Sequence, residues 1–187
     1  MQTHRLVCHP DTPTPIITSL KVTASRLSVD CVRIGFDVFG KMGAIAWPGD
    51  ALSANGPWER EDEIWKHTCF EAFLRVQGQT GYGEVNLATS GKWAAYRFSD
   101  YRSGMRYAEN VTIHKATWRI RPHRAGLHAV IQVPWFVEND IWEVGLSAVI
   151  EESDGTKSYW ALRHQPGPPD FHYADCFALE LAAPDRT

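Results

Sequence analysis

The chain has 187 residues, of which 44% are hydrophobic and 22% charged, and it contains eight tryptophans. This composition excludes a disordered chain and, with the length, predicts one folded domain spanning residues 1–187. The net charge of -3 offers no basic field, so we expect no nucleic-acid partner. No stretch reaches the roughly 18 apolar residues of a membrane span and no export signal opens the chain, which predicts a cytoplasmic protein without a membrane partner.

The four cysteines, Cys8, Cys31, Cys69 and Cys176, have wide and unrelated spacings. No C-x-x-C pair is among them. In a chain expected to be cytoplasmic, this pattern predicts reduced thiols rather than a disulfide framework.

Hydrophobic residues alternate with period two along most of the chain, which predicts strands and no long helix. Behind a proline-rich start, residues 20–27 and 30–40 are predicted strands, and Ile34, Phe36 and Val38 share one face of the second. Residues 44–48 predict a short strand that ends at Pro48. Residues 49–63 are polar and contain glycine and proline, so we expect an exposed loop.

The middle of the chain predicts a meander of antiparallel strands. Residues 68–77 and 82–101 supply three strands, separated by turns at 78–83 and at 89–92 (TSGK). Residues 102–110 are expected to form a loop. A hairpin follows, with strands in 111–122 and 127–136 and a turn at 123–126.

The last third predicts two more strands in residues 142–164, around an SDGT turn, and a closing strand at 176–181. Three prolines prevent residues 165–175 from forming a central strand. In total we expect about nine to eleven short strands and no crossover helix. The predicted fold is therefore all-β, a β-sandwich of two antiparallel sheets of jelly-roll or immunoglobulin type.

The stretch Ile64–Arg75 (IWKHTCFEAFLR) places an unusual group on one face of a predicted strand: Trp65, His67, Cys69, Glu71 and Phe73. Glu84 and Asn86 share a face of the next strand. The closing strands and the proline-rich segment add His164, Asp170 and His172 nearby. Since a sandwich needs only one apolar face per sheet, the polar and aromatic face is predicted to be a concave binding surface.

Several chemistries remain open for this group. His67, Cys69, Glu71, His164, His172 and Cys176 are zinc-ligand types, but strand alternation separates successive members by about 6 to 7 Å. Cys69 with a neighbouring histidine could act as a nucleophile, although Glu71 on the same face favours the protonated thiol. Met105 with His164 or His172 could ligate haem. A hydrogen-bonded structural cluster without any ligand is the remaining alternative.

Carbohydrate binding is a further interpretation, because sugar rings stack on aromatic side chains while their hydroxyls need polar partners. Trp65, Trp93 and Trp160 offer stacking surfaces. Glu71, Asn86, Arg102 and Asp170 offer hydrogen bonds. In this interpretation the carboxylates and the amide anchor hydroxyls, while Arg102 and His164 donate.

Four segments, IWKHTCFEAFLR, GYGEVNLATSGKWAAYRFSDYRSGM, LSAVIEESDG and SYWALRHQPGPPDFHYADCFALEL, resemble the bacterial DOMON-like proteins, relatives of family 9 carbohydrate-binding modules. The resemblance covers nearly the whole chain. It implies a stand-alone β-sandwich. Among the relatives, DOMON domains bind haem or sugars, and family 9 modules clamp a sugar between aromatic rings on a concave sheet face. The residues that match its motifs are Trp65, Cys69, Glu71, Asn86, Ser90, Trp93, Arg102, His164, Asp170 and His172.

Together these observations predict a protein that binds a small polar molecule, which we expect to be a carbohydrate or a sugar derivative. A haem-binding redox module and a Cys/His-dependent enzyme are the alternatives. We expect no catalytic residue, no metal ligand and no resident cofactor, with haem or a metal ion as the minor alternative. The expected ligand-binding residues are Trp65, Glu71, Asn86, Trp93, Arg102, Trp160, His164, Asp170 and His172.

Overall fold

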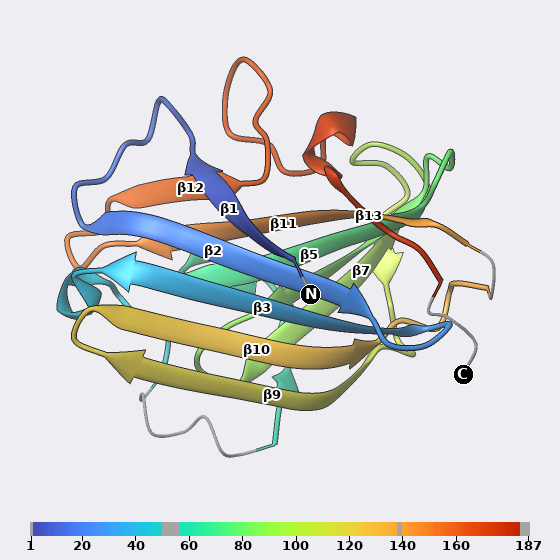
Figure 1. The fold of residues 1–187 in the computed structure, drawn as a ribbon, viewed down its shortest axis with the longest axis horizontal. Helices are drawn as coiled ribbons and strands as arrows, with labels where there is room; N and C mark the ends of the chain where they lie inside the picture. The colour runs from blue at the N-terminus through green and yellow to red at the C-terminus, as the bar shows by residue number, and fades with distance from the viewer. Residues whose placement is uncertain (1, 50–56, 138–139, 184–187) are drawn as a thin grey trace.

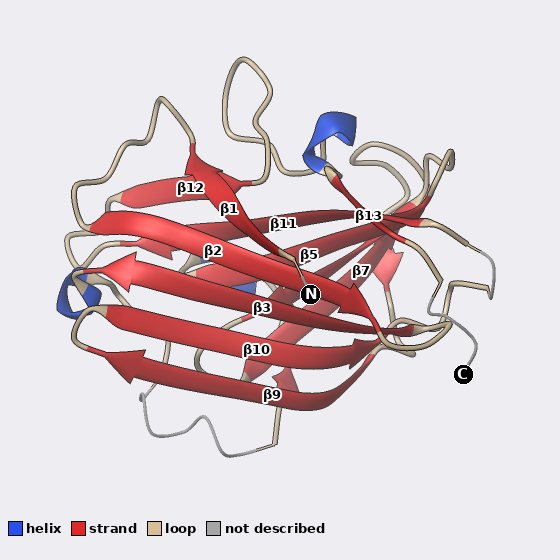
Figure 2. Ribbon diagram, viewed as in Figure 1, coloured by secondary structure: helices blue, strands red, loops and turns tan. Residues whose placement is uncertain are grey.

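The computed structural model describes residues 2–49, 57–137 and 140–183. Within these residues the regular structure is almost entirely β, with thirteen strands and three short 3-10 turns (Figure 2). The all-β prediction is confirmed. No helix in the described part of the chain is long and apolar enough to cross a membrane.

The strands follow one another along the whole chain. Their bounds are β1 Thr3–Cys8, β2 Ile17–Arg26, β3 Cys31–Gly40, β4 Glu59–Arg60, β5 Cys69–Val76, β6 Tyr82–Leu87, β7 Lys92–Phe98, β8 Arg106–Tyr107, β9 Thr112–Arg121, β10 Arg124–Gln132, β11 Trp142–Glu151, β12 Lys157–Ala161 and β13 Leu179–Leu181. The 3-10 turns are η1 Met42–Ala44, η3 Ile64–Lys66 and η4 Ala174–Cys176.

The strands form two layers (Figure 1). The front layer has the order β2-β3-β10-β9, and the back layer has the order β12-β11-β5-β6-β7. Strand β1 joins them, because Thr3–Leu6 pairs with β2 whereas Val7 and Cys8 pair with β12. Two separate antiparallel sheets were expected. Instead, the described strands form one curled sheet, which is mixed because β4 runs parallel to β7.

Period-two alternation builds the core between the layers. The predicted inward face of β3, Ile34, Phe36 and Val38, is fully buried, as are Val144 and Ile150 on β11. Burying a large aliphatic or aromatic side chain stabilises the fold by about 1.5–3 kcal/mol. The two layers are therefore held together by apolar side chains from both inner faces.

The stretch Ile64–Arg75 is not one strand, contrary to the prediction. Glu63 has a left-handed backbone (φ 61°), η3 follows at Ile64–Lys66, and β5 begins only at Cys69. Trp65 and His67 therefore leave the strand face on which Glu71 lies. Residues 44–48 likewise form no strand, since η1 ends there and Ile45 makes only an isolated bridge with Glu152.

The remaining predictions of strands and loops were confirmed in part. Strand β1 lies in the proline-rich start, where no strand was predicted, and β8 lies in the predicted loop 102–110. Of the expected loop 49–63, residues 50–56 lie outside the described residues. The predicted meander, the 111–136 hairpin and the strands of the last third are confirmed as β5 to β7, β9 and β10, and β11 to β13.

Candidate functional site

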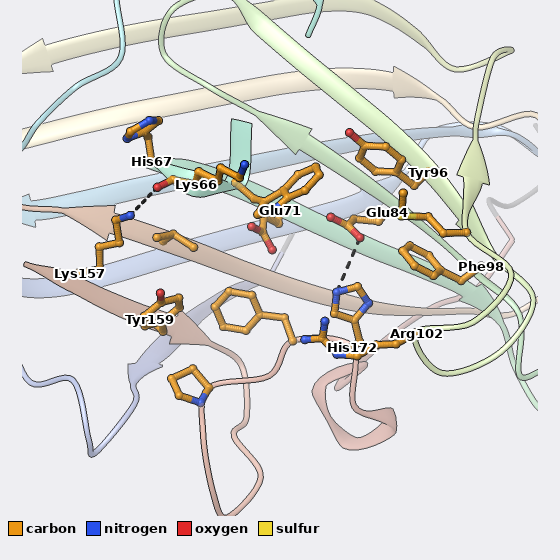
Figure 3. Close-up of a pocket in the computed structure, with 15 residues that line it drawn as sticks. Lys66, His67, Glu71, Glu84, Tyr96, Phe98, Arg102, Lys157, Tyr159 and His172 are labelled. Carbon is orange, nitrogen blue, oxygen red and sulfur yellow. Dashed lines mark hydrogen bonds and ion pairs between the residues drawn. The ribbon is translucent and has the colours of Figure 1, made fainter. Parts of the chain in front are cut away.

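A pocket of about 770 Å³ lies over the outer face of the back layer (Figure 3). Its floor comes from β5, β6, β7, β11 and β12. Its sides come from η3, from the loop after β7 and from the segment between β12 and β13. The lining residues are Trp65, Lys66, His67, Glu71, Glu84, Tyr96, Phe98, Arg102, Met105, Val149, Lys157, Tyr159, Pro169, Phe171 and His172.

Two buried carboxyl groups, those of Glu71 and Glu84, lie in the middle of the pocket (Figure 3). In the β5–β6 register Glu71 faces Asn86, and Phe73 faces Glu84, so the two glutamates are diagonal neighbours on one face. Such neighbours have Cα atoms about 7–8 Å apart, within reach of long side chains. The prediction that Glu71, Glu84 and Asn86 share a face of adjacent strands is confirmed.

Burial raises the pKa of both carboxyl groups. Desolvation is the main cause that raises the pKa of Glu71 well above its usual range, and repulsion from Glu84 adds to it. Desolvation likewise raises the pKa of Glu84 to about 7, against the opposing effects of the Asn86 hydrogen bond and Arg102. Near neutral pH the pair therefore resists carrying two full charges.

Asn86 and Ser147 hold the carboxyl groups in place. The Asn86 amide nitrogen donates to Glu84 Oε1 (2.6 Å), and the Ser147 hydroxyl donates to Glu71 Oε2 (3.3 Å). The Asn86 carbonyl oxygen is buried and has no hydrogen-bond partner among the described residues. The floor thus presents more acceptors than donors.

His172 closes one side of the floor. Its Nδ1 lies 2.7 Å from the Tyr82 hydroxyl. We assign that hydroxyl as the donor, because among the described residues its hydrogen has no other acceptor, while its oxygen accepts the backbone N–H of Arg102. Desolvation, with a smaller effect of Arg102, lowers the pKa of His172 to about 4. The ring is then neutral at pH 7 and directs Nε2–H toward Glu84, whose Oε2 lies 3.9 Å away.

Arg102 enters the pocket from the loop after β7, with a left-handed backbone (φ 48°). Its guanidinium forms two hydrogen bonds with Asp170, at 2.9 and 3.4 Å. The Tyr101 hydroxyl donates to the same carboxylate. Asp170 thus links the loop to the segment that carries His172.

Aromatic rings form the walls. Tyr96 and Phe98 stand on one side of the carboxyl groups and Tyr159 on the other (Figure 3). Trp65 meets Tyr96 edge to face, with ring centroids 5.5 Å apart. The Tyr96 hydroxyl donates to Asp62 (2.9 Å), which fixes that ring. These rings provide apolar surface beside the polar floor.

The structure brings together some of the expected site residues. Trp65, Glu71, Arg102 and His172 line the pocket. Asn86 and Asp170 do not line it, but they hold Glu84 and Arg102 through hydrogen bonds.

Three expected residues lie elsewhere. Trp93 and Trp160 are buried in the core between the layers, because Trp93 pairs with core residue Leu87 and Trp160 with core residue Ala148. His164 donates from Nε2 to the Val7 carbonyl (2.9 Å) and packs against His9. We expected Trp93, Trp160 and His164 on the binding face, but in the structure none of the three lines the pocket.

The sequence-based prediction did not include Tyr96 and Tyr159 in the site. The strand registers set by two predicted turns indicate the positions of both. The TSGK turn sets the β6–β7 register in which Tyr96 faces Glu84. The SDGT turn sets the β11–β12 register in which Tyr159 faces Val149, another pocket residue. Counting from each turn would have placed both rings on the pocket face.

The structure bears on the three alternatives for this site: a cysteine nucleophile, a metal ion and haem. Cys69 is fully buried, and desolvation followed by repulsion from Glu71 and Glu84 raises its pKa well above the usual range, so a thiolate nucleophile is disfavoured. No group of three or more potential metal ligands gathers in the part of the chain described. Met105 and His172 both line the pocket, whereas His164 does not.

Comparison with known proteins gives structural matches only. No family model and no curated protein matches the sequence. A crystal structure from Bacteroides uniformis, of a protein to which carbohydrate binding has been ascribed, matches with a TM-score of 0.67 and 12% identity, covering 98% of this chain and 87% of that one.

Two structures of a family 9 carbohydrate-binding module from Caldicellulosiruptor kristjanssonii also match. The complex with cellotriose has a TM-score of 0.57 and 9% identity, covering 100% of this chain and 84% of the module. The complex with glucose has a TM-score of 0.54 and 11% identity, covering 94% and 80%. The chain therefore has an all-β fold like that of family 9 carbohydrate-binding modules.

Proposed function

We propose that this protein binds a carbohydrate or sugar derivative in the pocket over Glu71 and Glu84. The observation that carries the proposal is the arrangement of aromatic walls around a buried polar floor. Such a pocket suits a sugar, whose apolar ring faces stack on aromatic side chains while its hydroxyls need acceptors and donors. The similar folds support the proposal, because two of them are complexes with cellotriose and glucose.

The roles follow from where each side chain lies. Trp65 and Tyr159 are the proposed stacking surfaces, and Glu71 and Glu84 accept hydroxyl hydrogens. Arg102 and the Nε2–H of His172 are the proposed donors. We further propose, from its sequence motifs, that the chain is related to the bacterial DOMON-like proteins.

Titration calorimetry with glucose, cellotriose and a panel of other sugars tests the proposal. Trp65→Ala should weaken binding at least about tenfold, since aromatic contacts contribute on the order of 1 kcal/mol or more beyond area burial. Trp135→Ala is the matched control, because Trp135 is also half-buried but lies outside this pocket. Absence of binding across the panel, or equal losses in both variants, would contradict the proposal.

Haem is the second candidate, since Met105 and His172 line the same pocket. Its support is weaker, because Nδ1 of His172 is occupied by Tyr82 and Nε2 faces Glu84. Addition of haem with an absorption scan decides this candidate. A Soret band that disappears in Met105→Ala and in His172→Ala would favour haem over a sugar.

A further inference from the structure

The two carboxyl groups of the pocket floor have few hydrogen-bond donors. Those of Glu71 and Glu84 are buried and lie on adjacent strands as diagonal neighbours. Asn86 supplies one donor to Glu84, and Ser147 supplies a longer one to Glu71. The Asn86 carbonyl oxygen also has no partner among the described residues, but it is buried and Asn86 does not line the pocket. Because an ionised carboxylate can accept several hydrogen bonds, each of the two keeps acceptor positions for a ligand.

The cations around the pocket are already engaged away from the floor. Lys66 binds Glu63 (2.6 Å), and Arg102 binds Asp170 (2.9 Å). Lys157 donates to the Lys66 carbonyl (2.6 Å) (Figure 3). Among the residues that the structure describes, Glu71 therefore has no direct ion pair, and Glu84 has only the neutral His172 at 3.9 Å.

The remaining titratable groups near the floor do not supply the missing charge. They are Cys69 on β5, Tyr82 on β6, Tyr96 on β7, Tyr159 on β12, His67 beside η3, and Asp170 in the segment before β13. His67 binds Glu151 through Nδ1 (2.7 Å). Cys69 and Tyr96 have pKa values raised first of all by burial. None of these groups therefore places a positive charge on the floor, which stays acidic.

We propose that the sugar bound here is an amino sugar, whose protonated amine sits on Glu71 and Glu84. This inference rests on the proposed function of the pocket. An ammonium group carries three N–H donors, so one amine can donate to both carboxylates at once. The faces of Tyr96 and Phe98 beside the carboxyl groups add attraction for a cation (Figure 3).

The proposal requires a proton to leave the site on binding. Glu71 and Glu84 share protons near neutral pH in the free protein, because burial disfavours two charges. An ammonium ion favours the ionised carboxylates, so the bound complex holds fewer protons. Affinity for an amino sugar should therefore rise as pH increases from about 5 to 7, provided that the amine stays protonated.

Calorimetry with glucosamine, glucose and N-acetylglucosamine tests the inference, because the three ligands differ in an amine, a hydroxyl and a neutral amide at one carbon. Glucosamine should bind at least about tenfold more tightly than glucose, which is the difference in affinity expected of a charge-assisted hydrogen bond. Titrations in two buffers of different ionisation enthalpy should show proton release with glucosamine and none with glucose. Equal affinities for the three sugars, or no proton release, would overturn the inference.

Variants locate the effect. In Glu84→Gln the ratio of glucosamine to glucose affinity should fall severalfold toward one, whatever the absolute affinities, since one of the two charged partners is lost. Glu180→Gln is the matched control, because Glu180 is an exposed carboxylate on β13, outside the pocket, and its ratio should stay native. A native ratio in Glu84→Gln would overturn the assignment of the amine to this floor.

A non-sugar amine, cyclohexylamine, separates the two proposals. If it binds with proton release while no sugar binds, the amine site on Glu71 and Glu84 stands, but the carbohydrate function fails and the amino sugar with it. If glucose binds as well as glucosamine, the carbohydrate function stands and the amine inference fails. If neither sugars nor cyclohexylamine bind, both are overturned.

Discussion

Cys69 lies beside Glu71 on β5, and its surroundings suppress the reactivity of a thiol. The residue is fully buried, and its raised pKa comes first from desolvation and then from the two glutamates. We expect Ellman's reagent to modify native Cys69 only as fast as the protein unfolds, and much more slowly than half-buried Cys31. Peptide mapping after timed labelling measures both rates. Rapid modification of Cys69 at neutral pH would revive a thiol-dependent activity.

His172 should make stability depend on pH in a defined window. Its pKa is lowered to about 4 in the folded protein, from an ordinary value near 6.5, mainly by desolvation. The folded state then binds fewer protons, so the free energy of unfolding falls as pH decreases from about 6.5 to 4, by up to about 3 kcal/mol from this group. His172→Asn should remove that part of the slope in denaturant titrations.

The comparison must be made between variants, because Glu71 and Glu84 act in the opposite direction. Their raised pKa values favour the protonated folded state, so stability from the pair is lost as pH rises. His128, an exposed histidine on β10, is the matched control position for the change to Asn. Identical slopes for native protein and His172→Asn would contradict the predicted role of His172.

Among the elements, β6 depends on a glycine at one position. A Cβ added at Gly83 would lie 2.3 Å from Cζ2 of Trp135, far inside van der Waals contact. Gly83→Ala should therefore displace the indole and lower the free energy of unfolding by about 1–3 kcal/mol, the usual range for overpacking. Denaturant unfolding and tryptophan fluorescence measure both effects.

Gly43→Ala provides the control for that change, because a Cβ there meets no atom within 4 Å. Its stability should stay within about 0.5 kcal/mol of the native value. Equal stability of Gly83→Ala and Gly43→Ala would mean that β6 and the segment carrying Trp135 yield more easily than their contacts indicate.

Strand alternation made most of the site floor predictable. It placed Glu71, Glu84 and Asn86 on one face, and adjacent strands brought them together as expected. Alternation failed before Cys69, because the left-handed Glu63 and η3 replace the strand that would have carried Trp65 and His67. Trp65 reached the pocket by this other path, so its position could not be derived from period two.

Alternation alone also leaves the choice of face undecided. The sequence places Trp160 and Tyr159 on opposite faces of β12, but only pairing with β11 decides which one faces the pocket. Contacts between residues distant in sequence cannot be predicted from alternation either. Arg102 and Asp170, for example, meet because two loops fold over the back layer. Local pattern contains no information about such contacts, whereas it sufficed for the inward face of β3.

For the whole molecule, β1 is the strand through which the two layers share hydrogen bonds. Leu6 on this strand is buried in the core, while Val7 beside it is 55% exposed. Leu6→Ala should lower the free energy of unfolding by about 2–5 kcal/mol, through lost burial and a cavity between the layers. Val7→Ala, the matched control on the opposite face, should change stability by less than about 0.5 kcal/mol.

Hydrogen exchange shows whether the loss reaches both layers. In Leu6→Ala, amide protection should fall together in β2 and in β12, because β1 pairs with both. A fall confined to one layer would contradict the role of β1 as the joint between them.

The pairing of β1 also bears on the order of events while the chain is being made. Residues 3–6 can pair with β2 early, but Val7 and Cys8 cannot pair with β12 until residues 157–161 have been made. Long-range pairings of this kind form slowly, since a large loop must close first. We expect the β1 edge of the front layer to stay unpaired during synthesis until β12 has been made, about 150 residues after β1.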